Sequence, residues 1–508
     1  MELNRTQHLA LIGAGPSTLY LLNSFTQMAR CPARISIFEV KSTVGVGNPY
    51  DTSMCEPNLL SNIGYDEIPP LILGFEQWYE SKFYMPYQVQ GQVLTRKIIG
   101  EYFADAFDYI LGVLRQHGVL VYMYRNTAVT GIIEDTRDDD VRMTLVGKGK
   151  PYQGFTHIVV NVGSSFCERR PSNGYVKPYP IKAYVKPEYQ RFVIMGMSLS
   201  AIDTAVGIAQ YRGHFARCAK GLTYSCEAPV QMTMMSRTGH FPWVWYPSKN
   251  TTLFYNWLTS HSIKGLRDLD EFNTFLFLPL LARYFPDIFH QVNAFNFEEV
   301  LTFLAGRRGQ CDAFAKLTLE LLANTHNNVD SHWPAAVVAA IHVIQSTPAL
   351  AQDYAKKKGT LHALLAACTA AVPRESIERI LALHEAGVLT VTTECEKQAS
   401  SAQESDHHCL IDARGAEPAE KGVVRLAQLL KRTYNGLVVD TSAESLSVSP
   451  HHKLYINEKE TNIYIGSAFL TPWFLNIPGL DTCAKFSRNI AKKISQTVEQ
   501  ENEPNVAV

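Results

Sequence analysis

Residues 8–18 read HLALIGAGPST, an apolar run followed at once by two glycines, a proline and two small polar residues. The apolar run is typical of a buried parallel strand, and the leucines that follow predict a helix. Glycine at position 13 permits a tight turn, and glycine at position 15 lets backbone amides at a helix start approach a pyrophosphate. Thr18 replaces the third glycine of the usual pattern, which predicts slightly looser packing of the helix on its strand. The stretch therefore predicts a nucleotide site that begins with Gly13, Gly15, Pro16 and Ser17.

The next predicted strand supports this interpretation. Residues 35–38 read ISIF and end in Glu39. An acid at this place accepts hydrogen bonds from a ribose 2′-OH and disfavours a 2′-phosphate, which suits FAD or NAD and not NADP. The alternative is an ordinary tight turn with a surface glutamate. The order of strand, turn, helix, strand and acid favours the nucleotide site.

Later segments extend the first unit. Residues 122–135 and 141–147 are expected to form a hairpin, and residues 157–163 a parallel strand. That strand ends in Gly163, where the backbone is expected to pass close to a cofactor. An amphipathic helix is expected to begin at Arg96. From the pattern alone, Arg96 is either directed at a phosphate or substrate, or is a surface arginine.

A second, more degenerate nucleotide pattern follows in the middle of the chain. Residues 191–195 read RFVIM and lead into GMSLSA at 196–201, with Gly196 and Ser198 at the expected phosphate end. The following strand, 230–235, ends in Ser236 and Arg237. A hydroxyl and a guanidinium at this place favour a 2′-phosphate, and therefore NADPH over NADH. Residues 210–227 are expected to be an inserted loop, and Asp203 to face solvent; the alternative is a vestigial unit that binds no nucleotide.

Composition excludes several classes of function. Lys and Arg total 47 and Asp and Glu total 48, which argues against nucleic acid or a membrane surface as partner. No run approaches the ~20 apolar residues of a transmembrane helix, and the N-terminus has no signal pattern. The ten cysteines are scattered without a C-x-x-C pair, which fits a reducing cytoplasm and predicts neither a metal site nor a redox dithiol. The sequence predicts a cytoplasmic protein with a small-molecule substrate.

The fold class expected is α/β, with two Rossmann-like dinucleotide-binding domains, for FAD and NADP, and a helical insertion. Leucines, alanines and aromatics at three- and four-residue spacing predict the insertion, which offers a lid, a pocket wall or a homo-oligomer contact. The expected boundaries are 1–170 and 405–500 for the FAD-binding domain, 171–246 and 373–404 for the NAD(P)-binding domain, 247–372 for the insertion and 501–508 for a disordered tail.

Several blocks together resemble the FAD/NAD(P)-binding flavoprotein family. They are GAGP at 13–16, VGVGNPY at 44–50, LLSNI at 59–63, TRKIIGEYF at 95–103, GMSLS at 196–200, MSRTG at 235–239, VPRESI at 372–377 and IDARG at 411–415. The resemblance extends to nitrosuccinate-forming aspartate N-monooxygenases and, more distantly, to NADPH-dependent N-hydroxylating and Baeyer–Villiger flavoenzymes.

The resemblance implies that Gly13, Gly15 and Glu39 hold FAD, that Asn62 lies near the isoalloxazine, and that Ser198 and Arg237 lie near NADPH. It also implies a monooxygenase that uses O₂ on an amine and needs no protein nucleophile; the catalytic residues stay unassigned. The pattern departs from related flavoproteins at Gly466-Ser467, where an acid commonly reaches the ribityl chain. Trp473 is either a flavin neighbour or a core residue. A flavin reductase with another acceptor and a non-catalytic FAD-binding scaffold are the alternatives.

Overall fold

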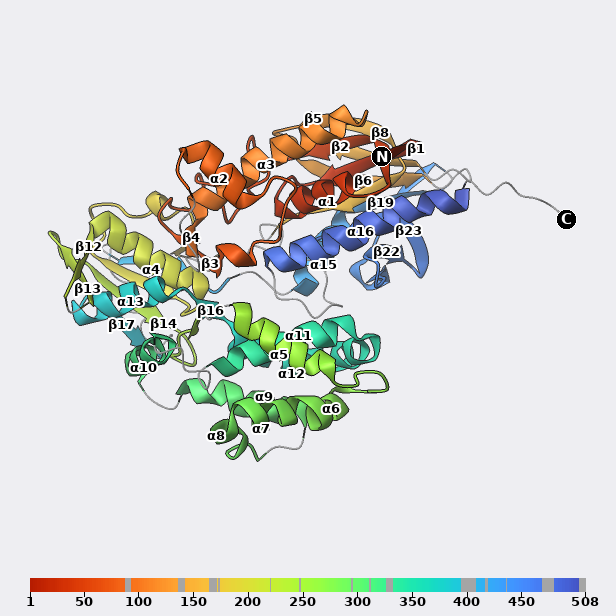
Figure 1. The fold of residues 1–508 in the computed structure, drawn as a ribbon. Coiled ribbons are helices and arrows are strands. Elements are labelled where there is room, and N and C mark those ends of the chain that lie inside the picture. Colours follow the sequence, from red (N-terminus) through yellow and green to blue (C-terminus); the bar gives the residue numbers. More distant parts are fainter. Residues whose placement is uncertain are drawn as a thin grey trace.

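Two parallel β-sheets, each leading through a glycine turn into a helix, organise the chain in the computed structural model (Figure 1). The structure describes residues 1–86, 93–135, 142–163, 171, 174–219, 221–245, 248–293, 296–309, 312–325, 332–393, 408–415, 419–434, 436–467 and 479–501. The expected helix–sheet class with two nucleotide-type units and a helical insertion is confirmed.

The first sheet has the strand order β21–β22–β23–β9–β1–β2–β5. Its five neighbouring strands from β23 to β5 are parallel, and β22 and β21 continue it in antiparallel pairing. The apolar run after His8 forms a central strand because Leu9, Ala10 and Leu11 have no exposed surface. The bounds are β1 (Glu2–Ile12), β2 (Arg30–Phe38), β5 (Leu120–Tyr124), β9 (His157–Val160), β21 (Leu446–Val448), β22 (Lys453–Ile456) and β23 (Lys459–Ile465).

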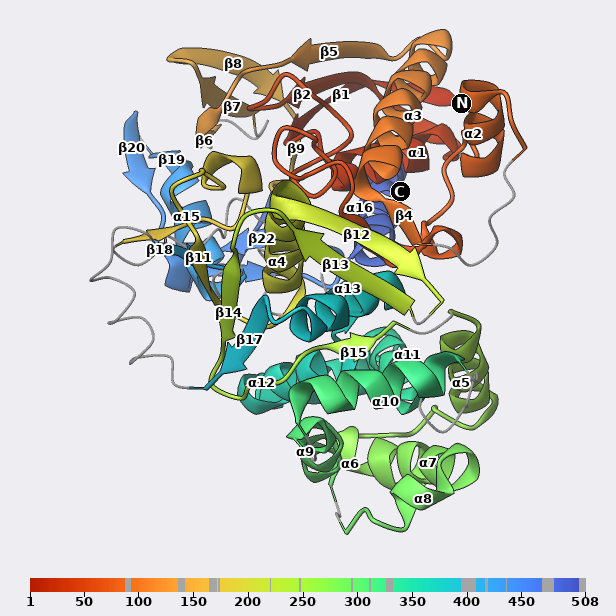
Figure 2. The same ribbon diagram turned by 90° about the vertical axis from the view of Figure 1, so that its left-hand side faces the viewer.

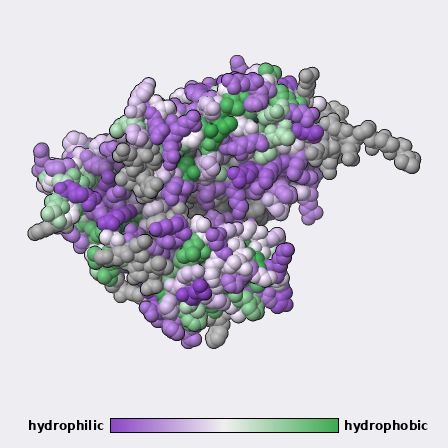
Figure 3. Space-filling view, viewed as in Figure 1, coloured by the Kyte–Doolittle hydropathy of each residue, from purple (hydrophilic) through white to green (hydrophobic). Residues whose placement is uncertain are grey.

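Helices cover one face of this sheet and a second layer of strands covers the other. The helical face packs Leu9 and Ile35 against α1 (Pro16–Thr26), α3 (Arg96–Gln116) and α16 (Leu480–Glu501). The opposite face packs Ala10 and Phe38 against α15 (Ala419–Leu429) and against a separate sheet, called the third sheet and described next. Figure 1 shows α16 running beside α1, so this late helix covers the N-terminal unit. Figure 3 shows hydrophilic side chains along the outer side of α16.

The third sheet has the order β20–β19–β6–β7–β8. Its strands are β6 (Val129–Asp135), β7 (Arg142–Gly147), β8 (Lys150–Phe155), β19 (Leu430–Tyr434) and β20 (Leu437–Asp440). The hairpin predicted from residue 122 is correct only from β6 onward. Residues 120–124 instead form β5, because Leu120 to Tyr124 pair with Arg34 to Phe38 of the first sheet.

The second sheet is entirely parallel, with the order β10–β18–β11–β14–β17. Its strands are β10 (Tyr175–Val176), β11 (Arg191–Met195), β14 (Gln231–Met235), β17 (Leu389–Thr392) and β18 (His408–Asp412). The predicted boundary at residue 405 is wrong, because β18 pairs with β11 and so belongs to the second unit. The segment predicted as a loop at 210–227 contains an antiparallel hairpin, β12 (Gly213–Cys218) with β13 (Gly221–Cys226).

The helices of the second unit are α4 (Leu199–Arg212) and α13 (Arg374–Glu385), which Figure 2 shows on the side of the sheet that carries the β12–β13 hairpin. Apolar side chains of both helices join those of β11 and β14 in one core. Ile377 and Leu383 of α13 pack there with Ile202 and Val206 of α4. The unit therefore has its own hydrophobic core.

The helical insertion leaves and re-enters the second unit at one place. Its two ends are β15 (Trp243–Val244) and β16 (Ala371–Val372), which pair with each other. Between them lie α5 (Ser248–Ser260), α6 (Leu269–Phe272), a π-helix (Asn273–Phe277), α7 (Leu278–Tyr284), α8 (Pro286–Phe289), α9 (Phe297–Gly306), α10 (Ala313–Thr325), α11 (Trp333–Ser346) and α12 (Pro348–Thr369). Most of these helices share a separate apolar core, as the predicted spacing of apolar residues requires.

No single helix among the described residues is long and apolar enough to cross a membrane. The helices α11 and α12, bent by 109° relative to each other, are together long and apolar enough, but only by length and composition.

Candidate functional site

The first glycine turn joins β1 to α1 against the end of β9. Gly13 has φ +95°, and its N–H donates to the Phe38 carbonyl at 2.8 Å. The Asn161 N–H donates to the Ile12 carbonyl at 2.8 Å, which brings the backbone after β9 against the turn. A Cβ on residue 13 would lie 2.5 Å from the Asn161 carbonyl oxygen. Only glycine fits here, because the backbone is in the left-handed region and the neighbouring strand leaves no space.

Beyond this turn, the start of α1 stays free of side chains. Gly15 is the N-cap, with no side-chain cap, and Pro16 occupies the first turn. Gly47 packs against them so closely that a Cβ on Gly15 would lie 3.4 Å from the Gly47 Cα. The first N–H groups of a helix have no partners within the helix and attract anions. Gly15 and Pro16, which the sequence predicts at the pyrophosphate, lie at this uncapped helix start.

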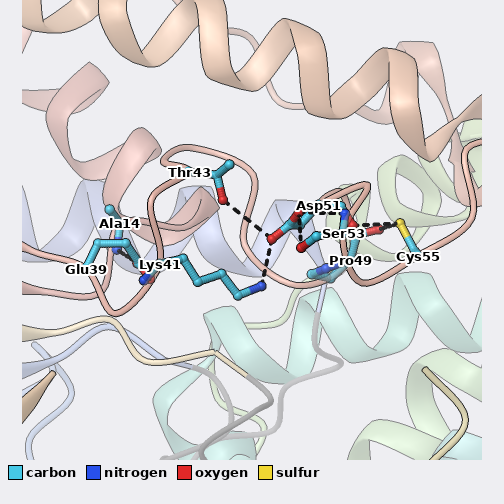
Figure 4. A network of polar contacts seen from close by, with 8 residues as sticks. All are labelled: Ala14, Glu39, Lys41, Thr43, Pro49, Asp51, Ser53 and Cys55. Atoms are coloured by element: carbon cyan, nitrogen blue, oxygen red, sulfur yellow. Dashed lines mark hydrogen bonds and ion pairs between the residues drawn. The ribbon is translucent and has the colours of Figure 1, made fainter. Parts of the chain in front are cut away.

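Glu39, at the end of β2, is fixed beside the glycine turn (Figure 4). Its Oε2 accepts from the Ala14 N–H at 2.7 Å, and its Oε1 accepts from the Lys41 N–H at 2.9 Å. The Lys41 ammonium in turn donates to Asp51 Oδ2 at 2.8 Å. Burial opposes the charge of Asp51, but hydrogen bonds from Lys41 and Ser53 outweigh it and lower the pKa of this carboxyl. The network holds the loop after Glu39 against the turn.

Thr18 ties the helix to the strand with two hydrogen bonds that the sequence pattern did not predict. Its hydroxyl donates to the Gly13 carbonyl at 2.5 Å and accepts from Asn161 Nδ2 at 2.9 Å. A glycine would provide neither bond, so threonine replaces close packing with two hydrogen bonds.

Asn161 also shows that the site fits a polar cofactor. Its Oδ1 is buried and has no hydrogen-bond partner among the described residues. This oxygen faces Gly466, directly after β23, where any Cβ would collide with it. Buried amide oxygens are rarely left without a donor, so an unpaired one beside a glycine cradle fits a hydroxyl-rich ligand. Asn161 was missed as a site residue, although it lies within the strand predicted at 157–163 and directly follows the observed β9.

The second unit repeats the geometry of the first. Gly196 has φ +125°, and its N–H donates to the Met235 carbonyl at 2.8 Å. The Ala413 N–H donates to the Met195 carbonyl at 2.9 Å, and a Cβ on Gly196 would lie 2.7 Å from the Ala413 carbonyl oxygen. Ser198 is the exposed N-cap of α4 and makes no side-chain cap. Two equivalent strand–turn–helix sites therefore exist in one chain.

The end of β14 carries the residues predicted for the 2′-phosphate. Ser236 Oγ accepts from the Gly239 N–H at 2.9 Å and so closes the turn. The Arg237 side chain is exposed beside it. The hydrogen bonds from Gly13 to Phe38 and from Gly196 to Met235 align Glu39 of the first unit with Ser236, and Arg237 follows one residue later. Opposite charges therefore lie just beyond the ends of these two strands, Glu39 after β2 and Arg237 after β14.

Arg96 is not a surface residue, because its side chain is buried in an ion pair with Asp203. Its Nη2 donates to Asp203 Oδ2 at 2.5 Å, and its Nε donates to the Leu60 carbonyl at 3.0 Å. The Tyr179 hydroxyl donates to the same Asp203 oxygen at 2.6 Å. Burial opposes the charge of Arg96, but Asp203 beside it outweighs burial and raises its pKa. The surface alternative for Arg96 and the prediction of a solvent-facing Asp203 are both wrong, because each residue is the buried partner of the other.

The structure also describes four other residues that the sequence predicts for the cofactor sites. Ser467 is buried after β23, and Ser17 Oγ donates to Cys483 Sγ of α16 at 3.3 Å. Gly163 is exposed, with open space around it. Asn62 is half-buried on β3 (Leu60–Gly64), which pairs with β4 (Val93–Thr95). Trp473 and residues 502–508 lie outside the described residues.

Glu67 was not predicted, and it joins β3 to the start of the insertion. Its Oε2 accepts from the Gly64 N–H at 2.9 Å and from Trp245 Nε1 at 3.0 Å. Burial raises the pKa of this carboxyl to about 7, although both hydrogen bonds act in the opposite direction. The hydrogen bond between Glu67 and Trp245 links the first unit to the segment that follows β15.

Because its pKa is raised on folding, Glu67 stabilises the fold when protonated, and this contribution is lost as pH rises from its ordinary value toward about 7. We expect the free energy of unfolding of the wild type, relative to Glu67→Gln, to fall by about 3 kcal/mol between pH 4.5 and 7. Urea unfolding at a series of pH values measures this difference. Glu80→Gln, at an exposed position on α2 (Phe75–Phe83), is the matched control. The assignment would be contradicted if the wild-type free energy of unfolding fell by the same amount relative to both variants.

Comparisons with known proteins agree with this geometry. A family model described as FAD-NAD(P)-binding matches residues 10–165. The chain is 24% identical over 535 residues to the uncharacterised protein YdhS of Escherichia coli K12, covering 96% of this chain and 97% of that protein.

Among solved structures, an FAD-bound cadaverine monooxygenase of Erwinia amylovora matches with a TM-score of 0.50 at 11% identity, over 97% of this chain and 95% of that one. An ornithine N-hydroxylase of Kutzneria sp. 744 matches with a TM-score of 0.49 at 11% identity, over 97% and 100%. The first of these supports the fold. The residues that match this family model, 10–165, contain the first glycine turn, Glu39 and Asn161.

Proposed function

We propose that this chain is an FAD-dependent, NADPH-using monooxygenase that oxygenates the amine of a small molecule or an amino acid. The observation that supports it best is the pair of equivalent glycine turns that end in opposite charges, Glu39 in the first unit and Arg237 in the second. An acid suits the free ribose hydroxyls of FAD, and a guanidinium suits the 2′-phosphate of NADPH. An amine substrate is proposed from the names of the structural neighbours, which act on cadaverine and ornithine.

Residues of the first unit would hold the FAD. The uncapped start of α1 at Gly15 and Pro16 would bind the pyrophosphate, and Glu39 the adenosine ribose. The unpaired Asn161 Oδ1 and the buried Ser467 would bind hydroxyl groups. When bound, FAD supplies the redox chemistry between NADPH, O₂ and the substrate.

Residues of the second unit would bind and orient NADPH. Ser198 at the start of α4 would receive the pyrophosphate, and Ser236 and Arg237 the 2′-phosphate.

We place the second unit at residues 171–246 and 373–415, with the insertion between them and the first unit on either side. Scattered cysteines and balanced charge support a cytoplasmic enzyme.

Anaerobic mixing of the purified protein with NADPH, and separately with NADH, tests the proposal directly. We expect rapid bleaching of the flavin absorbance with a preference for NADPH. Amine-dependent oxygen consumption in the presence of NADPH would then identify the substrate, with small amino acids and diamines screened first. A yellow protein that neither nucleotide bleaches would contradict the proposal.

A further inference from the structure

A buried ion pair joins the two nucleotide-type units. Arg96 begins α3 of the first unit, and Asp203 lies in α4 of the second. Their side chains are only 10% and 9% exposed, and their closest atoms are 2.5 Å apart. The Tyr179 hydroxyl donates to the same carboxylate oxygen, so the carboxylate is held from two sides.

The elements on either side of this pair are those that carry the two proposed cofactor sites. Arg96 Nε donates to the Leu60 carbonyl on β3, the strand that also carries Asn62. Asp203 lies just after the first turn of the helix whose N-cap is Ser198. One guanidinium therefore connects the strand predicted to lie near the flavin with the helix predicted to bind NADPH.

Residues 55–59, a neighbouring segment of the first unit, also contact the second unit. Glu56 Oε1 accepts from the Lys182 N–H at 3.1 Å and from the Tyr211 hydroxyl at 3.3 Å. Cys55 and Leu59 are buried within the apolar core of the second unit. Apolar contacts are non-directional and tolerate sliding, whereas a buried ion pair with fixed geometry is satisfied in one relative position only. The pair is thus a buried, charged and directional contact of this interface, beside the hydrogen bonds of Glu56.

We propose that Arg96 and Asp203 are positioning residues that fix the two units relative to each other and so set the rate at which NADPH reduces the flavin. The inference rests on the proposed function for its kinetic consequence, but not for its structural one. Transfer of a hydride from NADPH to the flavin would need near-contact geometry, and a displacement of about 1 Å lowers such rates by roughly 100-fold. Neither residue touches a cofactor in this role, so the affinity for each cofactor should not change.

The kinetic test uses Arg96→Lys and Asp203→Asn in the full-length protein. We expect the limiting rate of anaerobic flavin reduction by saturating NADPH to fall by about tenfold or more. The FAD content, the Kd for NADPH and the rate of reduction by dithionite should stay at wild-type values. Lys97→Met is the matched control, because Lys97 is the next residue of α3 and forms only an exposed pair with Glu101. A purely structural role would instead lower FAD content and thermal stability without this selective loss.

The structural test measures the distance between the units and needs no turnover. Nitroxide labels on the exposed Cys218 of β12 and on Tyr109→Cys, at an exposed position of α3, report it by pulsed electron resonance, with other reactive cysteines replaced by serine. We expect a narrow distance distribution in the wild type and in Lys97→Met, and a broader one in Arg96→Lys and Asp203→Asn. The double variant Arg96→Met/Asp203→Leu removes both charges, so it should fold well and still give the broad distribution.

An unchanged distribution in all of these variants would overturn the inference, as would a broad distribution with an unchanged rate of reduction by NADPH. If NADPH fails to reduce even the wild type, the proposed function is wrong, and the distance measurement alone then decides whether this pair fixes the two units.

Discussion

Gly13→Ala is expected to produce a folded protein that no longer retains FAD, with its affinity for FAD lowered by at least about 100-fold. Residue 13 has φ +95°, and a Cβ there would lie 2.5 Å from the Asn161 carbonyl oxygen. A side chain in the left-handed region adds about 1–2 kcal/mol of strain. The larger effect comes from displacement of the turn, because the start of α1 and the Asn161 amide must move apart. Flavin-to-protein ratio and FAD titration of the apoprotein measure the loss.

Gly149→Ala is the matched control for this prediction. Gly149 has φ +70°, so it has a comparable backbone requirement, but a Cβ there would meet nothing within 4 Å. It lies between β7 and β8, in the third sheet. The control should lose a little thermal stability and keep its FAD. Equal FAD retention in the two variants would contradict a cofactor site at the first turn.

Arg237→Ala is expected to raise the KM for NADPH by about 10–100-fold and to leave the KM for NADH nearly unchanged. The exposed guanidinium at the end of β14 has the shape and charge to bind a 2′-phosphate through two hydrogen bonds, and NADH has no such group. Steady-state oxidation of both nucleotides by the FAD-loaded protein gives the two ratios.

Arg191→Ala controls for the change in overall charge. Arg191 is exposed and lies in the same sheet, at the start of β11, and the proposed phosphate site lies beyond the ends of the strands. This variant should leave the preference for NADPH intact. If Arg237→Ala affects both nucleotides equally, the assignment of the 2′-phosphate to this position is wrong.

Local sequence was enough to predict both strand–turn–helix units. Each depends on contiguous residues: an apolar strand, a glycine that must take positive φ and a helix that begins directly after it, as at Gly13 and Gly196. The insertion was also predictable, because its helices show apolar spacing. The pattern is weaker in α12, where polar residues interrupt it and only five side chains are buried, among them Leu350 and Tyr354.

Features that depend on distant partners were not predictable. Arg96 and Asp203 each look like ordinary helix-surface residues, and only the folded chain brings them together across 107 positions. The position of β18 in the second sheet was missed for the same reason, since its register with β11 is a tertiary property. The hydrogen bond between Thr18 and Asn161 was missed because Asn161 lies far along the chain.

The route by which the first sheet closes has a consequence for biosynthesis. Strand β23 separates β9 from β22 in that sheet, and Ser487 of α16 donates to the Ser17 carbonyl at the start of α1. A nascent chain therefore exposes the N-terminal strands long before their last partners leave the ribosome, a delay on the order of tens of seconds at ~5–20 residues per second. The second unit, with all its strands between Tyr175 and Asp412, is complete earlier. Translation thus completes the second unit first, and we expect the N-terminal strands to wait longest for their partners.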